Sequence, residues 1–195
     1  MKNRVVKKGT SDKRAAVMEA FLNLVSERGF HNTPMSLVAK TSGVSTGNIY
    51  HYFSSKEDII IEIYRKIKLE FIRAMVDGFS EDQTFRERFR SIWLIVLEYR
   101  KSHPKETSFL EQFENSPYIT PSLSEELMVA AKPLGDLLTQ SIKEEIIKNL
   151  PIDLLVSLYT GGAVFLAKKC IAGTIVLDDE LIESTFDACW DAIKK

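Results

Sequence analysis

The sequence predicts an all-α fold, in which a small N-terminal module of three helices precedes a larger helical region. Apolar residues recur three and four positions apart in almost every segment, and no alternating strand pattern of useful length appears. Hydrophobic residues make up 45% and charged residues 27% of the 195 residues, which favours a packed core beneath a charged surface. Only 9 glycines and 6 prolines occur and no heptad pattern is sustained, which excludes collagen-like, low-complexity and coiled-coil chains.

The N-terminal module is expected to contain three short helices, over 12–28, 34–42 and 45–53. Gly29 and Gly43 follow the first two segments, and glycine is common just after a helix end. Thr33-Pro34 offers an N-cap hydroxyl and a proline at the first helical position, and Ser45 can cap the third helix. Two short helices joined by a three-residue turn indicate a helix-turn-helix.

The rest of the chain is expected to form six further helices, over 56–78, 82–101, around 109–113, 122–149, 151–172 and 179–194. Pro133 is expected to kink the helix over 122–149, because its ring clashes with the carbonyl four residues earlier. We therefore expect about nine helices in two domains. Residues 1–55 would be the helix-turn-helix domain, and residues 56–195 a helical regulatory and dimerisation domain.

Charge is divided unevenly between these two parts. Residues 1–53 carry eight Lys or Arg and three Asp or Glu, whereas the remaining residues carry 18 Lys or Arg and 24 Asp or Glu. The net charge of the whole chain is only −1. A basic module on an acidic body indicates that the module, and not the body, meets a polyanion.

The third segment, Ser-Thr-Gly-Asn-Ile-Tyr-His-Tyr-Phe over 45–53, has an apolar face and a polar face. Ile49 and Phe53 lie four residues apart and, with Val44, are expected to face the core. The hydrogen-bonding side chains that remain are Thr46, Asn48, Tyr50, His51 and Tyr52. Asparagine can pair with adenine through two hydrogen bonds, and threonine can contact a base edge or a thymine methyl group. The polar face is therefore predicted to read the major groove of DNA.

Over about its first 60 residues, the sequence resembles the DNA-binding signature of the tetracycline-repressor (TetR) family. The matching positions are Gly29-Phe30, Thr33, Val38-Ala39, Gly43-Val44-Ser45, Gly47, Ile49-Tyr50, Tyr52-Phe53 and Lys56-Glu57. The sequence departs from the family pattern at Pro34, Ser42 and Asn48. Asn48 lies on the reading helix, so its departure concerns which operator sequence is read and not whether DNA is bound.

The resemblance implies roles for individual residues of the module. Phosphate contacts are implied for Thr33, Tyr50, Tyr52 and Lys56, and base or groove contacts for Ser36, Thr46, Gly47 and Asn48. Ser45 and His51, on the same helix, complete the expected DNA-binding set. Long hydroxyl or ammonium groups at helix ends position a protein on DNA, and short side chains in the groove specify sequence.

A homodimer is expected, because one helix-turn-helix reads only a few base pairs and such modules usually bind palindromes in pairs. The segment 151–172 lacks charge over most of its length and 179–194 has one apolar stripe, so both are candidates for a four-helix bundle of the kind through which the family dimerises. The expected interface residues are Gly161, Gly162, Ile182, Phe186, Cys189, Trp190 and Ile193. The alternative is that both helices serve only the core of one chain.

The resemblance also implies a repressor that leaves its operator when a small apolar or amphipathic effector binds the acidic body. A pocket needs apolar walls with a few polar groups. The candidate lining residues are Phe71, Trp93, Tyr99, Phe109, Phe113, Tyr159 and Phe165, each of which also fits an ordinary core position. The sequence does not name the effector.

No membrane span or secretory signal is expected. The longest charge-free stretch in the C-terminal third, 154–167, is shorter than the roughly 18 apolar residues that a span needs. Cys170 and Cys189 are too few for a disulfide framework, so a cytoplasmic location is expected.

Neither a metal nor another cofactor is expected, and the chain is not expected to be an enzyme. His31, His51 and His103 form no metal-binding spacing, and no phosphate-binding glycine loop or nucleophile motif occurs. The rival interpretation is a helical small-molecule-binding protein or enzyme, in which the helix-turn-helix is only architectural.

Overall fold

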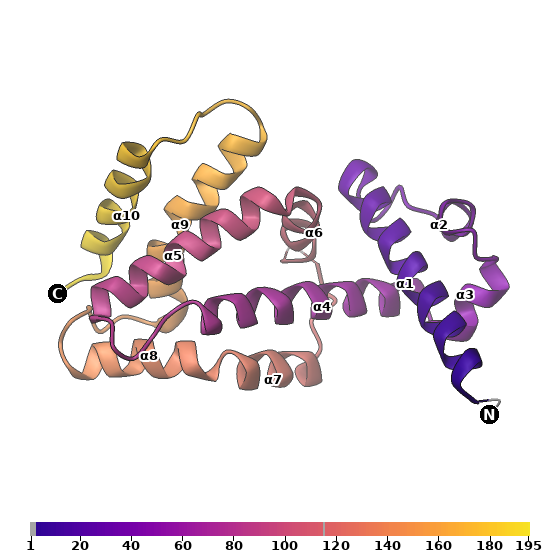
Figure 1. The fold of residues 1–195 in the computed structure, drawn as a ribbon, viewed down its shortest axis with the longest axis horizontal. Helices are drawn as coiled ribbons and strands as arrows, with labels where there is room; N and C mark the ends of the chain where they lie inside the picture. Colours follow the sequence, from indigo (N-terminus) through magenta and orange to yellow (C-terminus); the bar gives the residue numbers. More distant parts are fainter. Residues whose placement is uncertain (1–2, 115) are drawn as a thin grey trace. The chain divides into compact units, whose positions relative to one another are not determined.

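The computed structural model describes residues 3–114 and 116–195, and within these ranges the side chains from residue 12 onward. The described residues form ten α-helices, which confirms the predicted all-α class (Figure 1). Their bounds are α1 Asn3–Arg28, α2 Met35–Ser42, α3 Thr46–Tyr52, α4 Lys56–Asp77, α5 Phe85–Ser102, α6 Pro104–Glu114, α7 Pro121–Ala130, α8 Lys132–Lys143, α9 Ile152–Ile171 and α10 Asp179–Ile193. One isolated bridge, between Ile147 and Lys194, is the only extended pairing in the described part.

Two stretches differ from the helices expected from the sequence. α1 begins at Asn3 and not near residue 12, because lysine and arginine favour helix and a single internal glycine costs only about 1 kcal/mol. The helix expected over 122–149 is two helices, α7 and α8, and an irregular segment follows them in which Glu145 has φ 59°. Pro133 lies in the first turn of α8, where its missing N–H is not needed, so the proline begins a new helix instead of kinking a long one.

The helices group into two compact units. The head unit contains the chain up to Ile67 together with Lys105–Leu123, and the body unit contains Lys68–Pro104 and Ser124–Lys195. α4 is one uninterrupted helix that belongs to the head unit in its first half and to the body unit in its second half. The grouping places most of α6 with the first three helices, and the domain boundary between residues 55 and 56 stays a prediction.

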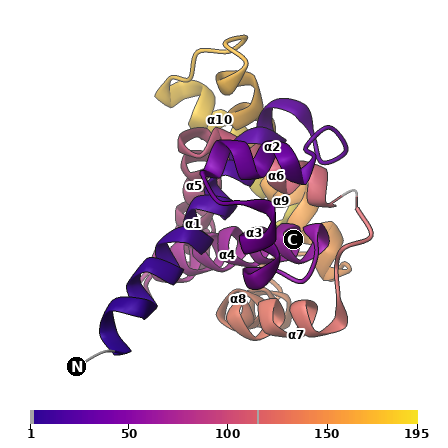
Figure 2. The same cartoon turned by 90° about the vertical axis from the view of Figure 1, so that its right-hand side faces the viewer.

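The head unit is built on α1, which packs against α2 and α3 (Figures 1 and 2). α6 adds two aromatic side chains to this unit. Phe109 meets Phe30 edge to face, with 5.2 Å between ring centroids, and Phe113 stacks on Tyr64 of α4 at 3.7 Å. Phe109 and Phe113 are fully buried, so these two pocket candidates are core residues of the head unit.

The body unit has its core where α5, α9 and α10 pack together (Figure 1). Trp93 of α5 meets the ring of Phe186 on α10, with 5.8 Å between centroids. Tyr159 of α9 donates a hydrogen bond from its hydroxyl to the carbonyl of Phe89 on α5. Burial raises the pKa of Tyr159, so the hydroxyl keeps its proton and this hydrogen bond over the physiological pH range.

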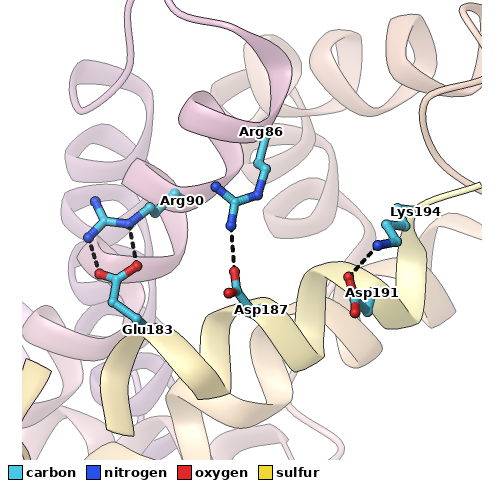
Figure 3. Close-up of polar contacts among 6 residues, drawn as sticks. All are labelled: Arg86, Arg90, Glu183, Asp187, Asp191 and Lys194. Atoms are coloured by element: carbon cyan, nitrogen blue, oxygen red, sulfur yellow. Dashed lines mark hydrogen bonds and ion pairs between the residues drawn. The ribbon is translucent and has the colours of Figure 1, made fainter. Parts of the chain in front are cut away.

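Two ion pairs join α5 to α10 on the surface of the body unit (Figure 3). Arg90 donates two hydrogen bonds to the Glu183 carboxylate, one of them 3.0 Å from Nε to Oε2, and Arg86 contacts Asp187 at 2.5 Å. The hydrogen bond from Arg90 lowers the pKa of Glu183. These side chains are partly exposed, so each pair contributes only about 0–1 kcal/mol, and their main effect is to set the register of α10 along α5.

α9 is the one helix of the described residues that is long and apolar enough to cross a membrane by length and composition. It has 20 residues, a mean hydropathy of 1.4 over its most apolar 18-residue stretch, and 28% of that stretch buried. The charge-free stretch 154–167 is only part of this helix. A core helix passes the same test, and α9 packs against α5 and α10 through buried residues that include Tyr159, Ala163 and Ala167.

Gly162→Ala is predicted to destabilise the chain, because an added Cβ would lie 2.6 Å from Sγ of Cys189 and 2.8 Å from Cγ2 of Thr185. Overpacking of this kind costs roughly 1–3 kcal/mol of the free energy of unfolding. Gly135→Ala is the control, since nothing lies within 4 Å of its Cβ and alanine favours a helix interior. Urea unfolding measures both variants, and wild-type stability of Gly162→Ala would contradict the close approach of α9 to α10.

Candidate nucleic-acid interface

α2 and α3 form a helix-turn-helix whose turn is set by local signals. α2 ends at Ser42, and Gly43 adopts φ 69°, in the left-handed region that favours glycine. Ser45 caps α3, because its Oγ accepts a hydrogen bond from the backbone N–H of Asn48, with 3.4 Å between the two atoms. The helix and the cap predicted for this segment are confirmed.

Buried side chains hold α3 against the rest of the head unit. Val44, Ile49 and Phe53 are buried, as predicted. The guanidinium carbon of Arg14 on α1 lies 4.9 Å from the centroid of the Phe53 ring, and Arg14 also pairs with Glu62 of α4 at 3.1 Å. These contacts tie α3 to both α1 and α4, so they fix which face of α3 is turned to solvent.

The solvent face of α3 carries most of the residues that the sequence assigned to DNA. The exposed members of that set are Ser36, Ser45, Thr46, Gly47, Asn48, Tyr50 and His51, and the half-buried members are Tyr52 and Lys56. Tyr50 is 48% exposed, which is unusual for a large aromatic side chain. Most of these residues lie on α3 itself, with Ser36 on α2 and Lys56 at the start of α4.

Gly47 lies in the first turn of α3, where it adds no side chain to the exposed surface. An added Cβ would meet no atom within 4 Å, and the residue is not in the left-handed region. The packing of the chain therefore does not require glycine here, although glycine costs a helix roughly 0.5–1 kcal/mol relative to alanine. The absence of a side chain at Gly47 therefore affects a molecule that binds the outer surface of α3 and not the packing within the chain.

The position of Thr33 does not agree with the phosphate contact that the resemblance implies. Its side chain is fully buried, and its hydroxyl donates a hydrogen bond of 2.8 Å to the carbonyl of Gly29. A phosphate cannot reach a hydroxyl in this position, so Thr33 positions the turn between α1 and α2 and does not contact DNA directly. It is also not the N-cap of α2, because Pro34 occupies that position without a side-chain cap.

Lys56 has a partner inside the head unit. Its Nζ donates a hydrogen bond of 2.5 Å to the carbonyl of Phe30, and this bond ties the start of α4 to the turn after α1. An ammonium group has three donors, so two remain for a phosphate.

The aromatic residues proposed for a pocket are divided between the two units. Phe109 and Phe113 lie in the head unit, whereas the body unit contains Phe71, Trp93, Tyr99, Tyr159 and Phe165. Phe71 stacks on Tyr99 at 4.6 Å, and Phe165 is 53% exposed on α9. Tyr159 lines a small apolar cavity of the body unit.

The apolar stripe of α10 faces the core of its own chain. Of the expected interface residues, Phe186, Cys189, Trp190 and Ile193 are buried and Ile182 is half-buried. Gly162 also packs against α10 within the chain, whereas Gly161 is exposed and an added Cβ there would meet nothing within 4 Å. For these α10 side chains, the interpretation as the core of one chain therefore agrees with the structure.

A different apolar stripe, on α9, is exposed, and of its members only Gly161 was among the expected interface residues. Leu154, Leu158, Gly161 and Phe165 follow the helical spacing of four, three and four along α9. Their neighbours Leu155, Tyr159, Ala163 and Leu166 are buried. Both stripes of α9 are apolar, so periodicity alone does not say which of them faces the core.

A surface helix-turn-helix with an exposed polar side on α3, together with an all-helical body, is the architecture of a DNA-binding transcriptional regulator. The chain belongs to the tetracycline-repressor family. A family model described as "Tetracyclin repressor-like, C-terminal domain" matches residues 84–194, and one described as "Bacterial regulatory proteins, tetR family" matches residues 17–63.

Individual relatives agree with this assignment. A TetR family transcription regulator from Marinobacter aquaeolei VT8 is 27% identical, with a TM-score of 0.88 over 97% of this chain and 99% of that chain. An uncharacterised HTH-type transcriptional regulator of Haemophilus influenzae is 24% identical over 97% of this chain and 100% of its own length. The transcriptional regulator FadR of Bacillus subtilis, in complex with stearoyl-CoA, shares the fold at 20% identity and a TM-score of 0.67, over 90% of this chain and 95% of that chain.

Thr33→Val is predicted to lower the free energy of unfolding by about 1 kcal/mol, because the shape of the side chain is kept and its hydrogen bond to Gly29 is lost. Thr41→Val is the matched control, since Thr41 is exposed on α2. Thermal unfolding compares the two variants. Equal effects of both substitutions would show that the buried hydroxyl of Thr33 has no special part in the turn.

Proposed function

We propose that this chain is a ligand-responsive repressor, which binds a palindromic operator as a homodimer and leaves it when a small apolar or amphipathic molecule binds the body unit. The observation that carries the proposal is the polar face of α3. Thr46, Gly47 and Asn48 are exposed on a helix whose other face is anchored by Ile49 and Phe53.

The chemistry of the α3 surface supports recognition of a DNA groove. Asn48 is suited to two hydrogen bonds with adenine, and Thr46 to a base edge or a thymine methyl group. Gly47 leaves room for the backbone of α3 to approach the bases. Tyr50 and His51 are exposed beside them and are suited to phosphate or sugar contacts, which position the helix without reading sequence.

The exposed stripe of α9 supports a homodimer. Leu154, Leu158 and Phe165 are 44%, 39% and 53% exposed, and Gly161 between them has no side chain to hold a second helix away. An isologous dimer brings the same surface of two chains together, so a stripe centred on a glycine suits packing against its own copy. Two heads would then read half-sites about 34–36 Å apart.

The continuity of α4 supports coupling between effector and operator. α4 runs without a break from the residue after the Ser54-Ser55 turn into the body unit, and Lys56 at its start is bonded to Phe30. A change in the direction of this helix would therefore move α3, and a shift of a few Å lowers the fit of two heads to one operator. Stearoyl-CoA in the complex of B. subtilis FadR supports an amphipathic effector.

Asn48→Ala is predicted to weaken operator binding by about 1–3 kcal/mol and to relax the preference at one base-pair position. Fluorescence anisotropy at fixed salt measures affinity for the DNA that flanks the coding region, and selection from randomised sites measures the preference. Asn149→Ala, at an exposed position of the body unit, is the control. An unchanged preference at every position would remove Asn48 from the reading set.

Phe165→Glu is predicted to produce monomers that bind the operator poorly. The side chain is 53% exposed, so a charge there does not disrupt the core, whereas it would be buried against its own copy in a dimer. Met128→Glu, 69% exposed on α7, is the matched control and is expected to remain dimeric. Sedimentation velocity reports both states. A Phe165→Glu protein that still forms dimers would rule out α9 as the interface.

A further inference from the structure

The body unit contains two hollows that share one wall. The inner hollow, of about 120 Å³, is bordered by α4, α5, α8 and α9 and is lined by residues that include Met75, Phe89, Leu134 and Tyr159. The outer hollow, of about 260 Å³, lies between α8 and the segment that joins α4 to α5, and its lining includes Phe79, Phe85 and Arg88. Leu137 of α8 lines both hollows and is only 6% exposed.

The inner hollow offers no polar group to a ligand. The hydroxyl of Tyr159 is bonded to the carbonyl of Phe89, and the hydroxyl of Thr160 donates a hydrogen bond of 2.8 Å to the carbonyl of Val156. The remaining lining side chains are hydrocarbon or thioether groups. Walls that offer no hydrogen-bond partner bind hydrocarbon groups and not polar ones. The part of a ligand that enters it must therefore be hydrocarbon.

The outer hollow offers a fixed cation. Nε of Arg88 donates a hydrogen bond of 3.0 Å to the carbonyl of Gln83, and a second guanidinium nitrogen bonds to the carbonyl of Glu81. The guanidinium carbon lies 5.5 Å from the centroid of the Phe85 ring. Carbonyls hold the group in place without neutralising it. Within the described residues Arg88 has no carboxylate partner, whereas Arg86 and Arg90 on the same helix pair with α10 (Figure 3).

The two acidic residues that line the outer hollow, Glu81 and Asp136, do not form an ion pair with Arg88. Asp136 is paired with Lys132 at 2.6 Å. Glu81 is exposed to water, where ions screen its charge, whereas Arg88 is half-buried and screened less. An anionic group is therefore the complementary partner for the free N–H groups of Arg88.

We propose that the two hollows form one effector site, which takes an amphipathic molecule with a hydrocarbon chain and an anionic head. The chain occupies the inner hollow, the head bonds to Arg88, and a change in the rotamer of Leu137 opens the passage between them. The two volumes together fall within the roughly 300–1,000 Å³ typical of small-molecule sites. This assignment rests on the proposed function and deepens it, since it names the class of effector and the residues that hold it.

Binding of sodium octanoate and of 1-octanol to the full-length protein tests the site. Trp190 reports on it by fluorescence, because its ring lies 5.3 Å from that of Phe89, which lines the inner hollow. Arg88→Gln is expected to weaken octanoate binding about tenfold or more and to leave octanol binding within about twofold, because only octanoate carries the charge. Arg88→Lys is expected to recover part of the octanoate affinity, and Arg86→Gln, whose arginine lies outside both hollows, is the matched control.

Filling the inner hollow tests the place of the hydrocarbon chain. Leu134→Trp adds a ring to its wall and is expected to weaken octanoate and octanol equally, whereas Leu134→Met keeps the volume and both affinities. Circular dichroism confirms that each variant is folded. Equal losses of octanoate affinity in Arg88→Gln and Arg86→Gln, or unchanged binding of both probes by Leu134→Trp, would overturn the assignment.

A measurement of operator affinity beside probe binding distinguishes failure of the effector site from failure of the proposed repressor function. Wild-type protein that binds its operator but neither probe would overturn the effector site and leave the repressor intact. Wild-type protein that binds both probes as described but no DNA would support the site and contradict the repressor.

Discussion

Burial of one side of α3 is the constraint on which the surface for DNA depends. A helix of seven residues is too short to be stable alone, so it forms because Val44, Ile49 and Phe53 are packed inside the head unit. The same packing leaves the polar side of α3 in solvent. The hydrogen bonds of Thr33 and Lys56 add to this effect, since they hold the turn after α1 and the start of α4 in place around α3.

The apolar residues of α9 and α10 in the body unit form a buried core and an exposed stripe. α10 buries its stripe within the chain, and the ion pairs of Arg86 and Arg90 set its register on α5. α9 lies against both helices and is apolar on its outer side as well, which accounts for its high hydropathy and leaves the exposed stripe that we propose as the dimer surface. The hollows beside α8 lie in the same unit, so effector binding and dimerisation would act on one set of packed helices.

The sequence predicts features that local signals determine. The ends of α2 and α3 follow from Gly43 and Ser45, and the inward positions of α3 follow from the spacing of Ile49 and Phe53. Local sequence signals do not predict the features that depend on packing between segments far apart in the chain. Thr33 is buried because a turn folds around it, the stripe of α10 faces its own chain because α5 and α9 cover it, and the hollow beside Leu137 exists only once four helices meet.

Hydroxyl-radical footprinting on the DNA that flanks the coding region tests whether two copies of the α3 surface lie in successive major grooves of one operator. We expect two protected segments on the same face of the duplex, with centres about one helical turn apart, and a loss of both with a chain that cannot dimerise. Protection of a single segment, or uniform protection that does not depend on sequence, would contradict it.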